Sequence, residues 1–218
     1  MRKEAEERRN EILDAADELF GQQGFDGTST NEILQKVGIA RGTLYYHFKS
    51  KEDIMDALIE RYSERILKAA KAIAANKHIA VYERIIGVVM ALNVSDDSGK
   101  EVIEHMHKPQ NALMHQKIQK VIVNEVPPIL TDIIREGIEQ QLFHTPYPYE
   151  CMEMIVAYTN TVFDDAMVNL TAEQFAHRVQ ALIFNVERLL GVERGSLQHM
   201  MKMFANENGD MELNNNPH

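Results

Sequence analysis

Apolar residues recur at helical spacing along most of the chain, and no segment shows the strict alternation of a half-buried strand. The first such stretch covers residues 3–22, and a long one covers residues 51–75. Proline, glycine and short polar clusters separate the later stretches, and Pro127 with Pro128 predicts a break after residue 124. The pattern predicts an all-α protein with further helices at about 79–93, 99–107, 110–124, 128–141, 147–169, 171–191 and 195–205.

The segment between the first two stretches, STNEILQKVGIARGTLYYHFKSKED, predicts two short helices joined by a tight turn. It begins with Ser29, and Glu32 three residues later completes a capping box. Gly38 suits the left-handed residue that ends a helix. Ser50 with Asp53 forms a second capping box at the start of the next helix. These signals predict a helix-turn-helix that is followed by a third, separately capped helix.

The second short helix combines a buried pair with an unusual polar face. Leu44 and Phe48 are four residues apart and are expected to point inward. Gly42 costs about 1 kcal/mol of helix propensity relative to alanine, which is explained if another molecule must approach the backbone closely there. A basic, aromatic and hydroxyl-bearing helix after a glycine turn suits insertion into the major groove of DNA. The residues of this face are Arg41, Gly42, Thr43, Tyr45, Tyr46, His47 and Lys49.

Charge is distributed unevenly along the chain. The formal net charge is −10, which by itself argues against a polyanionic partner. The stretch 36–51 nevertheless holds Lys36, Arg41, Lys49 and Lys51 and no acidic residue, so its local charge is +4. A local basic patch on an acidic protein favours binding at particular sites over general coating of DNA.

Composition also bears on the cellular compartment. Cys151 is the single cysteine, so an intrachain disulfide is impossible, as is usual in a reducing cytoplasm. The N-terminal segment is highly charged and lacks the apolar core of a secretory signal. The longest apolar run, about residues 85–92, is far shorter than a membrane span. We therefore expect a cytoplasmic protein without a membrane partner.

Residues 8–60 resemble the N-terminal domain of the TetR family of bacterial transcription regulators. The segment GIARGTLYYHFKSKED is highly specific for that family. The resemblance implies a DNA-binding domain at 1–60, a helical ligand-binding and dimerisation domain at 61–205, and a tail at 206–218 that its polar composition predicts to be disordered. The matching residues are Ile12, Ala15, Ala16, Leu19, Phe20, Gly24, Phe25, Thr28, Ser29, Ile33, Val37, Gly38, Arg41, Gly42, Leu44, Tyr45, His47, Phe48, Lys51 and Leu58.

The resemblance also implies roles for individual residues. Bases would be contacted by Arg41, Gly42, Thr43 and Tyr45, and phosphates by Thr28, Ser29, Thr30, Tyr46, His47, Lys49 and Lys51. Packing beneath the helix is the alternative for Tyr45, Tyr46 and His47. One departure is Ala40, where the family often has Ser or Thr as the N-cap. Without that cap the helix is expected to begin less firmly, by about 1 kcal/mol.

The family likeness further implies a homodimeric repressor that a small molecule releases from a palindromic operator. Apolar residues cover more than one face of the predicted helices 147–169 and 171–191, so we expect these helices to form the dimer interface. Methionines in the second domain suit either core packing or an adaptable apolar cavity. No residue identifies the ligand, and no cofactor is implied.

A second hypothesis comes from the segment EVIEHMHKPQNALMH. Its Glu104 and His107 are three residues apart and could face one metal ion from a helix. This pattern leaves open a helical metal-binding or metal-sensing protein, although no matching pair occurs on another predicted helix. Phosphate-binding loops, nucleophile elbows and zinc-protease motifs are absent from the sequence, so we do not expect an enzyme. The residues of this candidate metal site are Glu101, Glu104, His105, His107 and His115.

Overall fold

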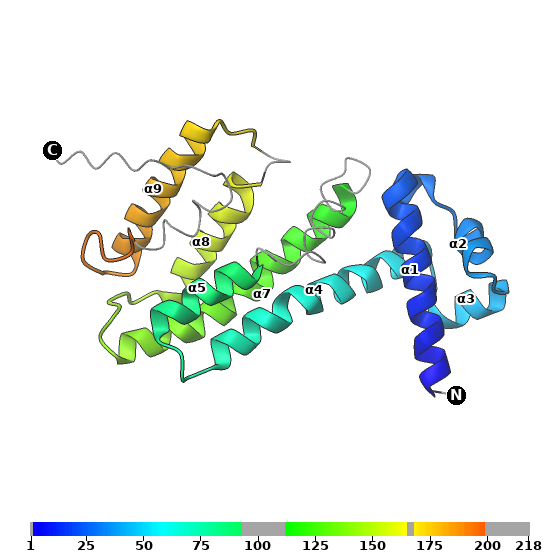
Figure 1. Ribbon diagram of the computed structural model, residues 1–218, viewed down its shortest axis with the longest axis horizontal. Coiled ribbons are helices and arrows are strands. Elements are labelled where there is room, and N and C mark those ends of the chain that lie inside the picture. Colours follow the sequence, from blue (N-terminus) through cyan, green and yellow to red (C-terminus); the bar gives the residue numbers. More distant parts are fainter. Residues whose placement is uncertain (1, 93–111, 165–167, 199–218) are drawn as a thin grey trace. The chain divides into compact units, whose positions relative to one another are not determined.

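The computed structural model describes residues 2–92, 112–164 and 168–198, with side chains from residue 4 onward. Within these ranges the protein is helical and has no strand (Figure 1), so the predicted all-α class is confirmed. No described helix is both long enough and apolar enough to cross a membrane. The helices are α1 (Arg2–Gly27), α2 (Thr30–Val37), α3 (Arg41–His47), α4 (Lys51–Ala75), α5 (Val81–Leu92), α7 (Ala112–Glu139), α8 (Pro148–Val162) and α9 (Ala172–Leu189).

The chain folds as two compact units. The first contains Met1–Ile66 and Val94–Val121, and the second contains Leu67–Asn93 and Ile122–His218. Both α4 and α7 therefore contribute residues to each unit. The boundary between a DNA-binding domain at 1–60 and a ligand-binding and dimerisation domain at 61–205 remains a prediction. The predicted helix 99–107, most of the predicted helix 195–205 and the predicted tail 206–218 lie outside the described residues.

Helix α1 supplies much of the core of the first unit. Ile12, Leu13 and Phe20 on its inner stripe are fully buried. The predicted end at residue 22 is too early, because helical structure resumes after Gly24 and continues to Gly27. Gly24 has φ 80° and ψ 167°, a backbone conformation that favours glycine and bends the chain toward α2.

A polar cluster fastens α4 to α1 within the first unit. The Tyr62 hydroxyl donates to the Asp17 carboxylate, and Arg61 Nη1 lies 2.6 Å from Asp14 Oδ1. Burial raises the pKa of the Tyr62 phenol above its ordinary value, and the negative charge of Asp17 raises it further. The phenol therefore stays protonated and remains a hydrogen-bond donor throughout the neutral pH range.

The second unit has an arginine at its centre. Arg84 on α5 is 0% exposed, and its Nη1 donates to the carbonyl oxygen of Ala74 at 3.1 Å. Its Nη2 lies 2.5 Å from Glu136 Oε1, while Lys77 donates to the other carboxylate oxygen of Glu136. Hydrogen bonding from Arg84, and then from Lys77, holds the pKa of Glu136 below its ordinary value. This cluster, Arg84–Glu136–Lys77, joins the last turn of α4 to α5 and α7.

The break predicted at Pro127 and Pro128 is wrong, because α7 continues through both residues. Interior prolines cost a helix about 3 kcal/mol or more, since each lacks an N–H and crowds the preceding turn. Burial of apolar side chains on both sides of the pair offsets this cost. Thr131 Oγ1 also donates to the Pro127 carbonyl oxygen at 2.7 Å. The buried residues around the pair are Val126, Ile129, Leu130, Ile133 and Ile134.

The last two described helices are shorter than predicted. Helix α8 has Pro148 in its first turn and ends at Val162, whereas the sequence predicted a helix to residue 169. Residues 165–167, which belong to that prediction, lie outside the described ranges. Helix α9 begins with the predicted capping box, in which Thr171 Oγ1 accepts from Gln174 N at 3.2 Å and Gln174 Oε1 accepts from Thr171 N.

Candidate nucleic-acid interface

The helix-turn-helix forms as predicted, and its caps hold the geometry. Ser29 Oγ accepts from Glu32 N at 3.2 Å, while the Glu32 carboxylate accepts from Ser29 N at 2.7 Å. Gly38 ends α2 with φ 73° and ψ 35°, and its N–H donates to Leu34 O at 2.9 Å. Leu44 is 1% exposed and anchors α3 to the core. The caps and this anchor fix the direction in which α3 presents its outer face.

The outer face of α3 is open to solvent. Tyr46 is 79% exposed and Tyr45 is 45% exposed, so neither ring packs beneath the helix. Arg41 is exposed at the first position of α3, and its guanidinium lies 5.8 Å from the centre of the Tyr45 ring. Gly42 is also exposed, and no atom lies within 4 Å of the place where a Cβ would stand. Packing within the protein therefore does not require a glycine there.

The N-cap of α3 and the residues beside its open face complete the description of this helix. Ala40 at the N-cap makes no side-chain hydrogen bond, as its departure from the family pattern predicts. Thr43 and His47 are half-buried at the flanks of the open face. The His47 ring packs edge-on against Tyr46, with the two centroids 5.0 Å apart. This contact holds the imidazole beside the most exposed aromatic ring of the helix.

Two of the four basic residues in the segment 36–51 form contacts inside the protein. Lys36 Nζ lies 2.7 Å from Glu18 Oε1 on α1. Lys51 Nζ donates to the carbonyl oxygens of Phe25 and Thr28 at 2.6 and 2.8 Å. Lys36 is itself exposed, but its ammonium is paired; within the described part of the chain, Arg41 and Lys49 are the exposed cations of the patch that have no ion pair.

The threonine and serine before α2 are also engaged inside the protein. Thr28 is 2% exposed, and its hydroxyl donates to Gly24 O at 2.7 Å. The Ser29 hydroxyl donates to Glu32 Oε2 at 2.7 Å. Hydrogen bonds from the hydroxyl and amide of Ser29 hold the pKa of Glu32 below its ordinary value. Thr30 is half-buried. The phosphate contacts predicted for these residues stay predictions. The hydroxyls of Thr28 and Ser29 already form hydrogen bonds that stabilise the fold.

In the second capping box, the Asp53 carboxylate accepts a hydrogen bond from a different residue than expected. Asp53 N donates to Ser50 Oγ at 3.1 Å, which is the predicted half of the motif. The Asp53 carboxylate accepts from the backbone N–H of Lys49 at 2.8 Å, one residue before the cap. This bond fixes the backbone of Lys49 between α3 and α4 while its side chain stays exposed.

Replacing Lys51 with methionine should destabilise the first unit. Methionine keeps the apolar stem but leaves two carbonyl oxygens without a charged donor, which is expected to lower the free energy of unfolding by about 2 kcal/mol. Chemical denaturation of both proteins would measure this difference. Lys49→Met is the matched control, because that ammonium is exposed and should leave stability unchanged. Unchanged stability of Lys51→Met, with a weaker salt dependence of DNA binding, would instead support the predicted phosphate role.

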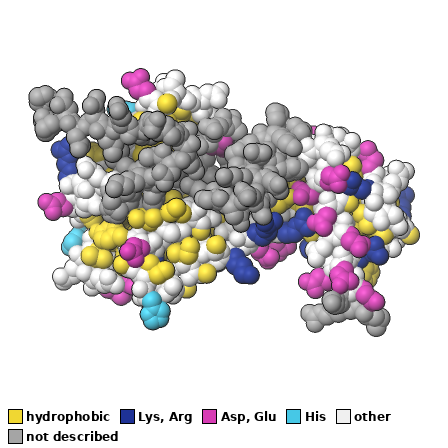
Figure 2. Space-filling model, viewed as in Figure 1, with side chains coloured by type: hydrophobic (Ala, Val, Ile, Leu, Met, Phe, Trp, Pro, Cys, Tyr) yellow, Lys and Arg dark blue, Asp and Glu magenta, His cyan; other side chains and the backbone are white. Residues whose placement is uncertain are grey.

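Acidic side chains gather over α1 in the space-filling view (Figure 2). All of them are exposed, and all but Glu6 lie on the side of the helix opposite its buried stripe. Their negative charge would repel a polyanion from this side of the first unit, whereas the open side of α3 carries no exposed acid. The exposed acids are Glu4, Glu6, Glu7, Glu11, Asp14 and Glu18.

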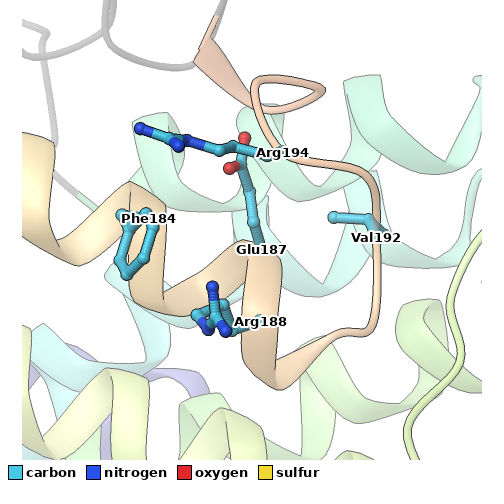
Figure 3. A pocket seen from close by; sticks show the side chains of 5 residues that line it. All are labelled: Phe184, Glu187, Arg188, Val192 and Arg194. Carbon is cyan, nitrogen blue, oxygen red and sulfur yellow. The ribbon is translucent and has the colours of Figure 1, made fainter.

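A pocket of about 280 Å³ lies in the second unit, at the end of α9 (Figure 3). Glu187 in its wall is 4% exposed, and its carboxylate accepts from the backbone N–H groups of Gly195 and Leu197 at 2.9 Å. These bonds fasten the segment after α9 to the helix. The guanidinium groups of Arg188 and Arg194 lie 5.2 and 5.8 Å from the centre of the Phe184 ring. Charged and apolar side chains therefore line this pocket together, and the small-molecule cavity that the family resemblance implies stays a prediction.

Family models match both parts of the chain. The model described as bacterial regulatory proteins, tetR family, matches residues 12–58, which include α2, α3 and the exposed face of α3. A second model, the tetracyclin repressor-like C-terminal domain, matches residues 94–184. The chain belongs to the tetR family of bacterial regulatory proteins.

Individual relatives of this TetR-family protein agree with that assignment. The HTH-type transcriptional regulator AcrR of Shigella flexneri is 46% identical over 59 residues, which are 27% of this chain and 27% of AcrR, so the match spans about a quarter of that relative. SmeT, the repressor of the Stenotrophomonas maltophilia multidrug efflux pump SmeDEF, has a TM-score of 0.61 at 20% identity over 86% of this chain and 91% of its own. RolR in complex with resorcinol has a TM-score of 0.56 at 16% identity over 92% and 95%. The two structures share the fold of this TetR-family protein.

The metal-binding hypothesis is not favoured by the family assignment. Its residues Glu101, Glu104, His105 and His107 lie outside the described ranges, and His115 is half-buried on α7. Among the residues that the structure describes, no three His, Cys, Asp or Glu side chains are grouped as metal ligands. Family membership accounts for the helix-turn-helix, which the metal hypothesis leaves unexplained.

Proposed function

We propose that this TetR-family protein is a sequence-specific DNA-binding repressor of transcription that acts as a homodimer. The open face of α3 is the observation that carries the proposal. Arg41, Gly42 and Tyr46 are exposed on a short helix whose inner side is anchored by Leu44 and Phe48. Such a helix can enter the major groove without rearrangement of its own fold.

The geometry supports separate roles along this face. Arg41 stands at the N-terminal end of α3, where it can donate two hydrogen bonds to guanine O6 and N7. The open space at Gly42 allows a base or sugar to approach the backbone. Thr43 and Tyr45 would complete the base contacts, while Tyr46, His47 and Lys49 would bind phosphates and set the register.

Exposed apolar side chains support a dimer interface on α8 and α9. Large apolar residues are rarely left in solvent together unless a partner covers them. On α8, Met154 is 59% exposed and Tyr158 is 39% exposed, and on α9 Phe184 is 40% exposed. A second copy packing against these helices would bury them and place two α3 helices on one duplex. The two half-sites would then be related by a two-fold axis, about 34–36 Å apart.

We further propose that a small-molecule effector binds the second domain and releases the operator. The effector would favour a spacing of the two α3 helices that does not match both half-sites, and α4 would transmit the change. RolR, which shares the fold, was solved with resorcinol bound. Operator and effector must weaken each other's binding by the same factor, because coupling free energies are reciprocal. We place this activity in the cytoplasm, where the buried free thiol of Cys151 would stay reduced.

Selection of bound duplexes from random DNA at near-physiological salt would test the proposal. We expect enrichment of a palindrome whose half-sites are separated by about one helical turn. The mass of the free protein in solution, measured in parallel, should be that of two chains. A folded dimer that enriches no sequence, with or without a library of small aromatic compounds, would overturn the proposed function.

A further inference from the structure

Arg9 on α1 lies next to the end of α3. Its guanidinium carbon is 5.3 Å from the centre of the Phe48 ring. Phe48 is 2% exposed and is the C-cap of α3. The contact therefore places the N-terminal part of α1 beside the C-terminal end of the helix that we expect to read DNA; both helices are labelled in Figure 1. Residue 9 precedes the segment 12–58 that the family model matches.

The helical period explains why Arg9 faces α3 and not the acidic side of α1. It stands three and four residues before Ile12 and Leu13, which are both fully buried. Residues at these spacings share one face of a helix, so Arg9 continues the inner stripe toward the N-terminus. Most of the exposed acids described above lie on other sides of α1; Glu6, three residues before Arg9, is the one that shares its face.

The Arg9 guanidinium keeps its hydrogen-bonding capacity. The neighbouring Arg8 pairs with Glu11, with Nη1 and Oε2 2.5 Å apart. Within the described part of the chain, Arg9 makes no ion pair or hydrogen bond, and its contact with the Phe48 ring uses none of its N–H groups. A guanidinium has five N–H donors in a rigid fork that matches two oxygens of a phosphate.

We propose that Arg9 binds the DNA backbone at the end of α3, as a contact supplied from outside the helix-turn-helix. When a helix occupies the major groove, its ends approach the sugar–phosphate walls. Lys49, the exposed cation at the same end of α3, would share this wall. The Phe48 ring orients the guanidinium in advance, so less side-chain freedom is lost on binding. This inference rests on the proposed function, because it assigns a residue to the same DNA interface.

Paired variants of the two neighbouring arginines would test the role of Arg9. Arg9→Gln and Arg8→Gln change the net charge equally, so a general charge effect would appear in both. The probes are the selected palindrome and a scrambled duplex of equal length, each titrated from low to high salt. For Arg9→Gln we expect the log–log salt slope on both duplexes to fall by roughly two per dimer, with affinity reduced on the order of tenfold. For Arg8→Gln we expect the slope of the original protein.

The Arg9→Lys variant keeps the positive charge but removes the planar guanidinium, so it separates the two contributions to DNA binding. It should also perturb the packing of α1 less than Arg9→Gln does. A lysine should retain most of the salt slope but bind more weakly than arginine, because its ammonium cannot bond two oxygens in the same fixed geometry. Thermal unfolding of each variant would show whether α1 is intact. An Arg9→Gln protein that is folded and keeps the original slope and affinity would overturn the inference. Failure of the unmodified protein to bind any duplex would instead overturn the proposed function.

Discussion

Replacing Arg41 with alanine should weaken operator binding by about 1–3 kcal/mol at each half-site and relax base preference at one position. The side chain is exposed at the start of α3, and it is positioned by the Tyr45 ring and not by an ion pair. Its removal should therefore cost little folding stability. Because a dimer carries two copies, the two losses would add for well-separated half-sites. The expected loss on a complete operator is then roughly 2–6 kcal/mol.

Competition binding against operators with single base changes would measure both effects of Arg41→Ala. The original protein should discriminate strongly at one symmetric pair of positions, and the variant should accept all four bases there. Lys49→Ala provides the contrast, because loss of a phosphate contact weakens all sequences alike and lowers the salt slope by about one per contact. An Arg41→Ala protein that keeps the operator's affinity and base preference would show that another residue reads that position.

Replacing Glu136 with glutamine should lower the free energy of unfolding by about 3 kcal/mol, because it leaves the buried Arg84 without a countercharge. The Arg84 side chain is 1% exposed, whereas that of Glu136 is 20% exposed, so the arginine bears most of the penalty. Denaturant titration of the two proteins would measure the difference. Exchange of both residues, as Arg84→Met with Glu136→Leu, is the control. It removes the whole pair and should recover much of the lost stability.

The effect of Glu136→Gln should also depend on pH in a defined direction. The folded pKa of Glu136 lies below its unfolded value, so its charge stabilises the protein at pH values above that unfolded value, about 4.3. This contribution is lost as the pH falls through the lower, folded pKa. The stability gap between the original protein and the variant should therefore be full at pH 7 and shrink below about pH 4. A gap that stays constant down to acid unfolding would mean that packing, and not charge, causes the loss.

The short-range features of the fold could be predicted from sequence because their causes are local. The capping boxes at Ser29 and Thr171 and the left-handed Gly38 depend only on residues within one helical turn. The open face of α3 could be predicted as well, because the spacing of Leu44 and Phe48 determines which side is buried.

Features that depend on distant contacts could not be predicted in this way. In the sequence Lys51 belongs to a basic patch. In the structure its ammonium donates to the carbonyl oxygens of Thr28 and Phe25, which are 23 and 26 residues earlier in the chain. Lys36 is likewise paired with an acid on another helix. The continuity of α7 across Pro127 and Pro128 depends on the burial of side chains from a core that no local window contains. In each case tertiary contacts override the local preference.

The segments that build the first unit determine whether the helix-turn-helix could be isolated as a fragment. That unit is built from two separate stretches of chain, and the second includes the opening turns of α7. Met114 and Ile118 in those turns are 0% and 3% exposed, and Lys117 Nζ lies 2.5 Å from Asp56 Oδ1 on α4. A fragment that stopped at the end of α4 would lack these side chains. We therefore expect such a fragment to be less stable than the first unit of the full chain, because part of that unit's core comes from residues that follow α4 in the sequence.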